Sequence, residues 1–431
     1  MANFDKNKTK IVLCSRSSSA DHKDFTWGSE NYSYRIVLDR FYDFFKRSGF
    51  DVGIVEDSRI YHHKVSLSKF GSKNLIHIAF QSPDEARVMP NAYNICSFAW
   101  EFDSMPNKKF LKNLERFDEL WPTSFQAYNF LKKFLKDKTK LVKKVQIPLS
   151  DFYLKNDKPF SFNRTFKDVE IFNLNPAETL VPMVSDLKES GYIFSIFNPW
   201  DGRKDFKSMI EIFLDNRNKS PGILLLKLSI DNKPTGTKWN NIYDILEKHY
   251  EVSNLNKIAK NIKVKNSKNT NIKKSRSNNK GTKNIVRNKK KIFLITEKLS
   301  DKQLYSIYKH SKFVWYTSKC EGTNLPVVEA ILSGSNVITP VHSGLNDYLK
   351  SSYPLKIDSE LTFMSQHWIQ EYNFELIDGD RPPTWFKVKS KSNFDLLNNF
   401  DDYLDKLKQS ETFSNVKNYF SDREIWSAIR K

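Results

Sequence analysis

Short apolar segments typical of buried β-strands alternate with amphipathic helical segments along most of this 431-residue chain. A first series opens with the strand signal KIVLC at residues 10–14, and apolar positions at helical spacing then predict a helix over residues 32–48, which Gly49 ends. The pattern restarts at residues 192–198 and continues to residues 336–340. Strands that alternate with helices form a parallel sheet covered on both faces, so two series predict two α/β units. Further strands are predicted at 50–56, 74–80, 93–100, 118–124, 222–230, 291–295 and 313–317, and further helices at 125–136, 206–214, 239–250 and 301–310.

These two series divide the chain into domains. An N-terminal Rossmann-like domain is predicted over residues 1–185 and a C-terminal Rossmann-like domain over 186–410, with a helical tail over 411–431. The boundary is placed where Pro182 and a polar, acidic stretch interrupt the pattern. A chain of this length is too long for one ordinary core and comfortable for two.

The net charge of +20 is concentrated in one segment. Residues 257–291 hold 14 Lys or Arg and no acidic residue, and subtracting these 14 from +20 leaves +6 for the rest. Residues 252–291 are therefore predicted to form a basic, low-complexity insert. The insert could bind an anionic surface such as nucleic acid or membrane phosphates. It lacks the aromatic residues that usually accompany basic charge at a nucleic-acid site, so a solvated loop is the favoured interpretation.

Other classes of site are poorly represented. Cys14, Cys96 and Cys320 are far apart, which predicts buried, reduced thiols and no zinc site. No apolar stretch approaches the length of a membrane span, and the sequence predicts a cytoplasmic enzyme, with peripheral membrane contact as an alternative. Neither GxGxxG nor GxxxxGK[ST] occurs. An Asp-x-Asp spelling at 378–380 lies among Gly and Pro and is interpreted as a turn, so no metal site is expected.

The densest chemical signal is a strand–loop–helix–strand unit at residues 313–340. A polar loop follows the strand, Asn324 is a candidate N-cap, and Gly334 ends the helix. Such a loop lies at the carboxyl edge of a parallel sheet, where open α/β sheets bind ligands. The backbone amides of Gly322, Thr323, Asn324 and Leu325 are expected to converge on an anion. Glu321 and Glu329 can face the same crevice, where acceptor-only carboxylates suit sugar hydroxyls.

The segment EGTNLPVVEA resembles the E-x7-E signature of retaining GT-B glycosyltransferases, family 4 in particular, whose usual form is EGxGLPxxEAxAxG. The resemblance extends to DKQLYSIYKHSKFVWYTS, ITPVHSGLNDYL and FNPWDGRKDF, and more weakly to FAWEFDSMP and DELWPTS. It implies a GT-B fold, with two Rossmann-like domains facing across a cleft, the acceptor on the first domain and the nucleotide sugar on the second.

The resemblance also implies roles for single residues. Glu329 would bind the donor ribose, Glu321 would contact the transferred sugar, and the loop amides would hold the diphosphate. Arg203 and Lys204 would neutralise the diphosphate, while a second basic residue common in the family is replaced by Asn198. The position of a first-domain histidine is taken by Trp100 and Glu101, which makes Glu101 a candidate catalytic residue, although Trp100 could equally be part of the core.

The implied reaction moves a hexose from a UDP- or GDP-linked donor to a glycan or lipid-linked hydroxyl, retains the anomeric configuration and needs no metal or other cofactor. Such a reaction belongs to polysaccharide biosynthesis. An anion-binding helix terminus beside basic residues suits a diphosphate leaving group, which a glycoside hydrolase does not have. Two alternatives stay open: a polyanion-binding protein acting through residues 257–291, and a sugar-nucleotide binder without catalysis. The basic, amphipathic residues 125–144 either rest on anionic lipid or form a Rossmann helix with an exposed basic face.

Overall fold

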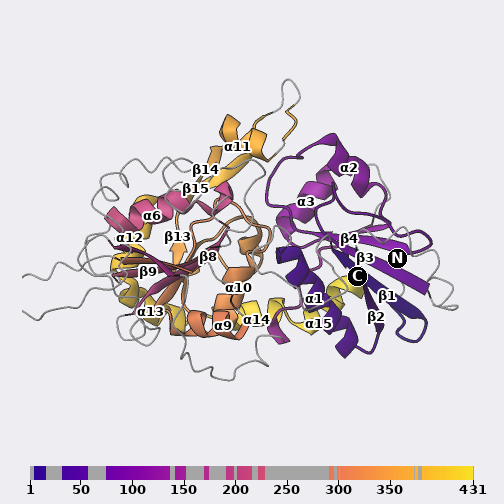
Figure 1. Ribbon diagram of the computed structural model, residues 1–431, viewed down its shortest axis with the longest axis horizontal. Coiled ribbons are helices and arrows are strands. Elements are labelled where there is room, and N and C mark those ends of the chain that lie inside the picture. Colours follow the sequence, from indigo (N-terminus) through magenta and orange to yellow (C-terminus); the bar gives the residue numbers. More distant parts are fainter. Residues whose placement is uncertain are drawn as a thin grey trace, which may run out of the picture.

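Two large sheets, one in each half of the chain, dominate the computed structural model (Figure 1). Helices lie on both faces of each sheet, as the alternating sequence pattern predicts. The structure describes residues 4–15, 32–56, 74–135, 141–151, 169–173, 191–198, 201–215, 222–228, 291–295, 299, 301–372, 374–376 and 381–430.

The first sheet has six parallel strands in the order β2-β1-β3-β4-β5-β6. Successive side chains along β3 point to opposite faces, so Ile76 and Ile78 enter one hydrophobic core and Ala79 another. Both faces are therefore apolar and both are covered. The strands are β1 (Thr9–Ser15), β2 (Asp51–Glu56), β3 (Asn74–Phe80), β4 (Tyr93–Phe98), β5 (Glu119–Pro122) and β6 (Leu141–Val142).

Among the described residues of this half, helices cover both faces of the sheet. Helix α1 (Tyr32–Arg47) packs its phenylalanines on one face and ends before Gly49, whose φ of +86° favours glycine. Helices α2 (Lys108–Leu114) and α3 (Phe125–Phe134) cover the other face. Each begins at a side-chain cap, because Asn107 accepts from the Phe110 amide at 2.9 Å and Ser124 accepts from the Ala127 amide at 3.2 Å.

The second sheet has seven strands in the order β13-β12-β11-β8-β9-β10-β7, all parallel except β7, which is antiparallel to β10. Strand β7 lies within residues 1–185, so the predicted boundary at 185/186 falls after the first strand of the second sheet. The sequence analysis did not predict β7, because this antiparallel edge strand is not part of the alternating series of strands and helices. The strands are β7 (Val169–Asn173), β8 (Ile193–Phe197), β9 (Ile223–Leu228), β10 (Lys291–Ile295), β11 (Phe313–Trp315), β12 (Val337–Pro340) and β13 (Lys356–Ile357), and the helices of this half include α6 (Phe206–Asp215), α9 (Asp301–His310), α10 (Leu325–Leu332), α12 (Ser390–Asn398) and α13 (Phe400–Lys408).

An insertion between β13 and α12 reaches the first domain. It comprises the antiparallel pair β14 (Ser359–Phe363) and β15 (Thr384–Val388) and the short helix α11 (Gln366–Glu371). Phe374, after α11, packs edge-on against Phe102 with ring centroids 5.2 Å apart, and both belong to one apolar cluster with Trp100. The two domains therefore share a hydrophobic contact, and Trp100 is a core residue of it.

The predicted tail forms two helices, α14 (Thr412–Tyr419) and α15 (Asp422–Arg430). Helix α14 contacts α10 of the second domain, whereas α15 lies on the first domain, where Trp426 packs against Phe44 with ring centroids 4.9 Å apart. Arg47 of α1 forms an ion pair with Asp422 at 3.0 Å. The tail thus crosses back from the second domain to the first (Figure 1).

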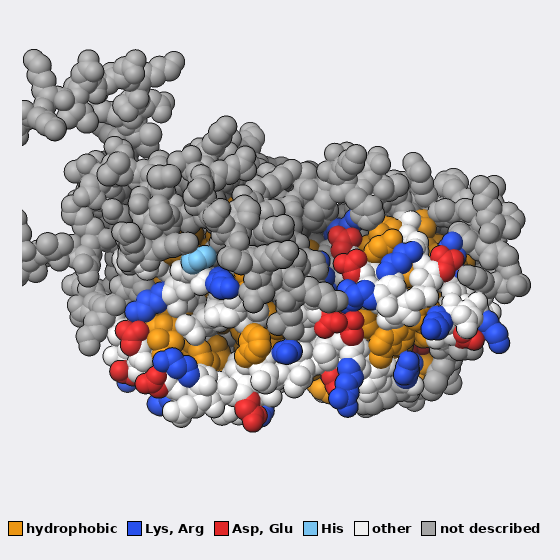
Figure 2. All heavy atoms as spheres, turned by 90° about the horizontal axis from the view of Figure 1, so that it is seen from below, with side chains coloured by type: hydrophobic (Ala, Val, Ile, Leu, Met, Phe, Trp, Pro, Cys, Tyr) orange, Lys and Arg blue, Asp and Glu red, His pale blue; other side chains and the backbone are white. Residues whose placement is uncertain are grey.

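Several further predictions from the sequence can be compared with the structure. Cys14, Cys96 and Cys320 are free and buried, and burial raises the pKa of Cys96 and Cys320, which favours protonated thiols. No helix in the described part of the chain has the length and apolar character needed to cross a bilayer. On the face seen in Figure 2, Lys and Arg are interspersed with Asp and Glu. The basic insert 252–290, the predicted helix 239–250 and the Asp-x-Asp spelling at 378–380 lie outside the described residues.

Candidate active site

The strand–loop–helix corner of the second domain is formed by β11, the loop to Asn324 and α10. Val327, Val328 and most other residues of α10 are buried, since the helix packs between the sheet and α14. Within the described part of the chain, nothing accepts a hydrogen bond from the backbone amides of Gly322, Thr323, Asn324 or Leu325. Four unsatisfied N–H groups at a helix N-terminus are suited to an anion.

Asn324 occupies the N-cap position but does not cap the helix with its side chain. Its backbone lies in the left-handed region, with φ of +58°, and its carbonyl accepts from the Val327 amide at 3.0 Å. The expected side-chain cap is therefore wrong. Asn tolerates this conformation better than other residues with a Cβ, which explains how it stands where the family signature has Gly. Its Nδ2 is buried and has no hydrogen-bond partner among the described residues.

The first domain covers this corner directly. A Cβ on Gly322 would lie 2.6 Å from the Cβ of Ala99, just after β4, and Thr323 Oγ1 donates to Thr123 Oγ1 at 3.2 Å, just after β5. The carboxyl ends of the two sheets therefore face each other. From the second domain, Gly344 in the 3-10 helix η6 (Ser343–Asp347) donates its amide to Glu321 O at 2.9 Å. The corner is held from both sides.

Lys204 meets Glu321 across this edge, with 2.5 Å between Nζ and Oε1. Lys204 lies in the 3-10 helix η4 (Gly202–Lys204) after β8, which Asp201 caps by accepting from the Arg203 amide. Glu321 is buried and precedes α10. The predicted cation and the predicted sugar-contacting carboxylate thus come together and neutralise each other in this structure.

Arg203 is engaged differently from the expectation that it neutralises a diphosphate. Its Nη2 lies 2.7 Å from Asp201 Oδ2, and its Nη1 lies 2.6 Å from Oε1 of Glu101 in the first domain. Burial alone would lower the pKa of Arg203, but the two carboxylates raise it well above its ordinary value. Asp201 also accepts from the Tyr372 hydroxyl at 2.6 Å. Arg203 and Glu101 therefore form an ion pair between the domains.

Glu329 is buried on α10, facing α9. Tyr308 of α9 donates its hydroxyl to Glu329 Oε2 at 3.4 Å. Glu321 precedes α10 and pairs with Lys204, whereas Glu329 lies in α10 and contacts Tyr308 of α9; that both carboxylates face one crevice stays a prediction.

Several residues near the site carried no sequence signal. Lys319 Nζ lies 3.3 Å from Asp205 Oδ1 and 4.5 Å above the Trp385 ring. A Cβ on Gly202 would lie 2.4 Å from the Trp368 ring, so the insertion packs directly on η4. In the described part of the chain, Asp205 Oδ2 and the buried His342 Nε2 also lack hydrogen-bond partners. Unsatisfied polar atoms are uncommon in native interiors, so these atoms are candidates for contact with water or a polar ligand.

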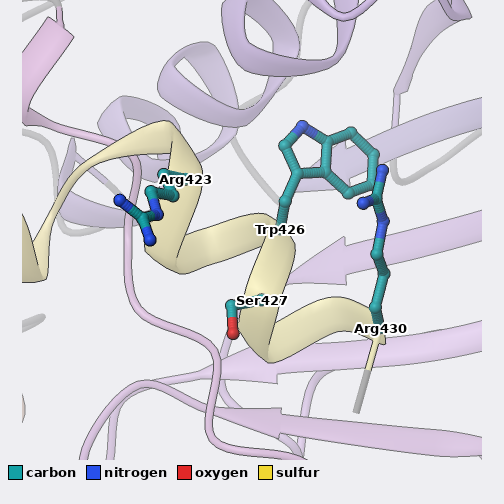
Figure 3. Close-up of a pocket in the computed structure, with 4 residues that line it drawn as sticks. All are labelled: Arg423, Trp426, Ser427 and Arg430. Carbon is teal, nitrogen blue, oxygen red and sulfur yellow. The ribbon is translucent and has the colours of Figure 1, made fainter.

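Two other features are separate from this edge. Among the described residues, no group of three or more His, Cys, Asp or Glu side chains could hold a metal ion. A surface pocket on α15 is lined by Arg423, Trp426, Ser427 and Arg430, with Arg430 beside the Trp426 ring (Figure 3). It lies on the tail, where neither sheet presents a carboxyl end.

Known proteins match this chain in structure and not in sequence. No protein-family model and no curated protein matches the sequence. HepE from Anabaena, solved in complex with UDP, superposes with a TM-score of 0.52 at 9% identity over 98% of each chain. The trehalose-6-phosphate synthase OtsA superposes with a TM-score of 0.55 at 10% identity, again over 98% of each chain. The chain spans 54% of S. aureus TarM, and 83% of the chain matches at 15% identity with a TM-score of 0.42. The chain has the GT-B fold, with two Rossmann-like domains joined by a C-terminal helical tail.

Proposed function

We propose that this protein is a glycosyltransferase that moves a hexose from a nucleotide-diphosphate sugar to a hydroxyl acceptor. The observation that carries the proposal is the α10 corner, where four backbone amides with no acceptor among the described residues lie in one segment with the buried carboxylates of Glu321 and Glu329, and Lys204 pairs with Glu321. Amides and a lysine suit a diphosphate, and carboxylates suit sugar hydroxyls. The fold supports the same conclusion, because HepE has it and was solved with UDP.

Each group would have a defined task. Lys204 and the amides of residues 322–325 would stabilise charge on the departing diphosphate, an electrostatic contribution that usually dominates catalysis. Glu329 would hold the ribose and Glu321 the transferred sugar. Lys204 would then exchange Glu321 for a phosphate oxygen, which would free the carboxylate for a sugar hydroxyl. Arg203 and Glu101 would position the two domains rather than contact phosphate, because their charges already satisfy each other.

Finer parts of the proposal follow from the resemblance to family 4. Transfer would retain the anomeric configuration, and the cationic side chain and helix terminus would serve where other enzymes use a metal. The donor would be UDP- or GDP-linked, and the acceptor a glycan or a lipid-linked hydroxyl in cytoplasmic polysaccharide biosynthesis. A lipid-linked acceptor would also explain peripheral contact with an anionic membrane.

The proposal is tested by nucleotide and nucleotide-sugar binding followed by transfer assays. UDP, GDP and their hexose conjugates are screened by thermal shift, because a ligand that binds only the folded state raises the melting temperature. Lys204→Ala should lower turnover by about 10² to 10³. Lys207→Ala is the matched control, since Lys207 is a half-exposed lysine of α6 that pairs with Glu211 at 4.0 Å.

Glu321→Gln separates an enzyme from a silent binder. In an enzyme it should abolish transfer while nucleotide-diphosphate binding persists, and Glu211→Gln should change neither. Wild-type protein that binds no nucleotide diphosphate would refute the proposed function. Binding without transfer to any glycan or lipid-linked acceptor would indicate a sugar-nucleotide binder.

The alternative of a polyanion-binding protein rests on residues 257–291, which lie outside the described residues. Deletion of this segment distinguishes the two proposals. Transferase activity should survive the deletion, whereas polyanion binding through the segment should be lost.

A further inference from the structure

We propose that helices α2 and α3 together form a docking surface for an anionic lipid bilayer. The surface is defined by five exposed lysines and two exposed phenylalanines and is called the α2–α3 face below. Its members are Lys108, Lys109, Lys112, Lys132, Lys133, Phe125 and Phe134.

Both helices lie side by side on one face of the first sheet (Figure 1). Phe110 of α2 and Phe130 of α3 pack on the same ring, that of Trp100, with centroids 4.8 and 6.3 Å away. These contacts fix the buried side of each helix. At 100° per residue, Lys112 and Lys132 then point away from the sheet, so the lysines of both helices share one outer layer.

The charged side chains of the two helices themselves are all basic. Neither α2 nor α3 contains an acidic residue. Three exposed carboxylates border the two helices: Glu375 of the insertion, whose Oε2 accepts from the Lys108 amide at 3.4 Å, and Glu115 and Asp118, which follow α2. No ion pair with a described residue involves Lys108, Lys112 or Lys132. Clusters of four to eight basic residues on amphipathic helices recognise anionic headgroups, with about fivefold in binding for each lysine near the surface.

Exposed aromatic side chains favour a bilayer over a purely electrostatic partner. Phe125 and Phe134, at the two ends of α3, are 51% and 40% exposed. Lys133 Nζ lies 5.8 Å from the Phe134 ring, so apolar and cationic groups are adjacent. At a bilayer, phenylalanine enters the headgroup boundary while lysine remains among the phosphates.

The face also adjoins the candidate site. Helix α3 begins two residues after Thr123, which contacts Thr323 of the corner, and α2 begins seven residues after Glu101. A protein docked through the α2–α3 face would therefore bring the first-domain side of the site to the headgroup layer. This arrangement deepens the lipid-linked part of the proposed function, but the surface can be tested without any sugar donor.

The test is vesicle sedimentation with the full-length protein. Vesicles of phosphatidylcholine with about 30 mol% phosphatidylserine are compared with phosphatidylcholine alone at low ionic strength. The test variant neutralises the five lysines of the face: Lys108→Gln, Lys109→Gln, Lys112→Gln, Lys132→Gln and Lys133→Gln. The matched control removes the same charge from five exposed lysines of the second domain: Lys387→Gln, Lys389→Gln, Lys391→Gln, Lys406→Gln and Lys408→Gln. Melting temperatures confirm that both variants fold.

We expect the wild type and the control to bind the anionic vesicles, and the test variant to bind at least about 25-fold more weakly, which corresponds to two lysines. Phe125→Ser with Phe134→Ser should weaken vesicle binding without affecting binding to single-stranded RNA. Equal loss in both lysine variants, no loss in the test variant, or no wild-type binding would overturn the proposal. If the protein bound RNA more tightly than anionic vesicles, and the two phenylalanine substitutions left RNA binding unchanged, the α2–α3 face would be assigned to a polynucleotide instead.

Discussion

We expect Gly344→Ala to destabilise the loop of the candidate site, because Gly344 packs directly against the backbone of Gly322. A Cβ at this position would lie 1.7 Å from Gly322 O and 2.5 Å from Gly322 C, which is short of ordinary van der Waals contact by roughly 2 Å and roughly 1 Å respectively. Both atoms belong to the backbone, so no side chain can rotate away. The Gly344 amide also donates to Glu321 O at 2.9 Å, and the two segments cannot separate without losing that bond.

Overpacking of this kind costs about 1–3 kcal/mol and sometimes more, and a backbone clash belongs at the upper end. A loss of about 3 kcal/mol lowers the melting temperature of a domain of this size by roughly 6–12 °C. The assay is thermal unfolding followed by circular dichroism, with Gly53→Ala as the control. A Cβ at Gly53 meets nothing within 4 Å, so that variant should be neutral or stabilised by about 0.4–1 kcal/mol. The reasoning is refuted if Gly344→Ala melts within about 2 °C of the wild type, or if both variants lose the same stability.

Three further predictions concern other parts of the molecule. Burial lowers the pKa of His342 to about 4, so between pH 6.5 and 4 the unfolded chain binds a proton that the folded chain does not. The free energy of unfolding should therefore fall by about 3 kcal/mol as the pH drops from 6.5 to 4. Urea titrations of His342→Gln should lack this part of the pH dependence. Arg203→Met leaves the two half-buried carboxylates of Glu101 and Asp201 without their shared cation and should destabilise by about 1–3 kcal/mol, whereas Lys207→Met should melt like the wild type. Trp426→Ala should cost about 3 kcal/mol and expose the tail to limited proteolysis, an outcome that unchanged cleavage would contradict.

The sequence predicted the fold because its signals are local. Alternation of strands and helices gave two parallel sheets, and Gly49 and Gly334 marked helix ends with positive φ. The antiparallel strand β7 and the pair β14 and β15 were missed. Each is short or exposed, and each is held by a partner distant in sequence, which no local pattern records.

The candidate site was predictable to the same extent. Glu321, Glu329 and the loop amides come from one continuous segment, so their proximity follows from a single strand and helix. The partners of Arg203 do not follow in this way, because Glu101 and Tyr372 come from a different domain and a later insertion. Asn324 shows a further limit: its sequence position suggested a cap, but the tight turn required a left-handed backbone.

The return of the tail to the first domain has a mechanical consequence. Residues 146–150, which lead out of the first domain, are hydrogen-bonded to residues 417–420 of the tail, with Ser150 Oγ donating to Lys417 O at 2.6 Å and Gln146 Nε2 to Tyr419 O at 2.9 Å. The outgoing and returning segments therefore run together at one side of the molecule. Two domains joined along one side can undergo a hinge rotation about that side, which opens the opposite side. The opposite side carries the ion pair between Arg381 and Asp103 and the contact between Phe374 and Phe102, so these groups should separate farthest when the domains open.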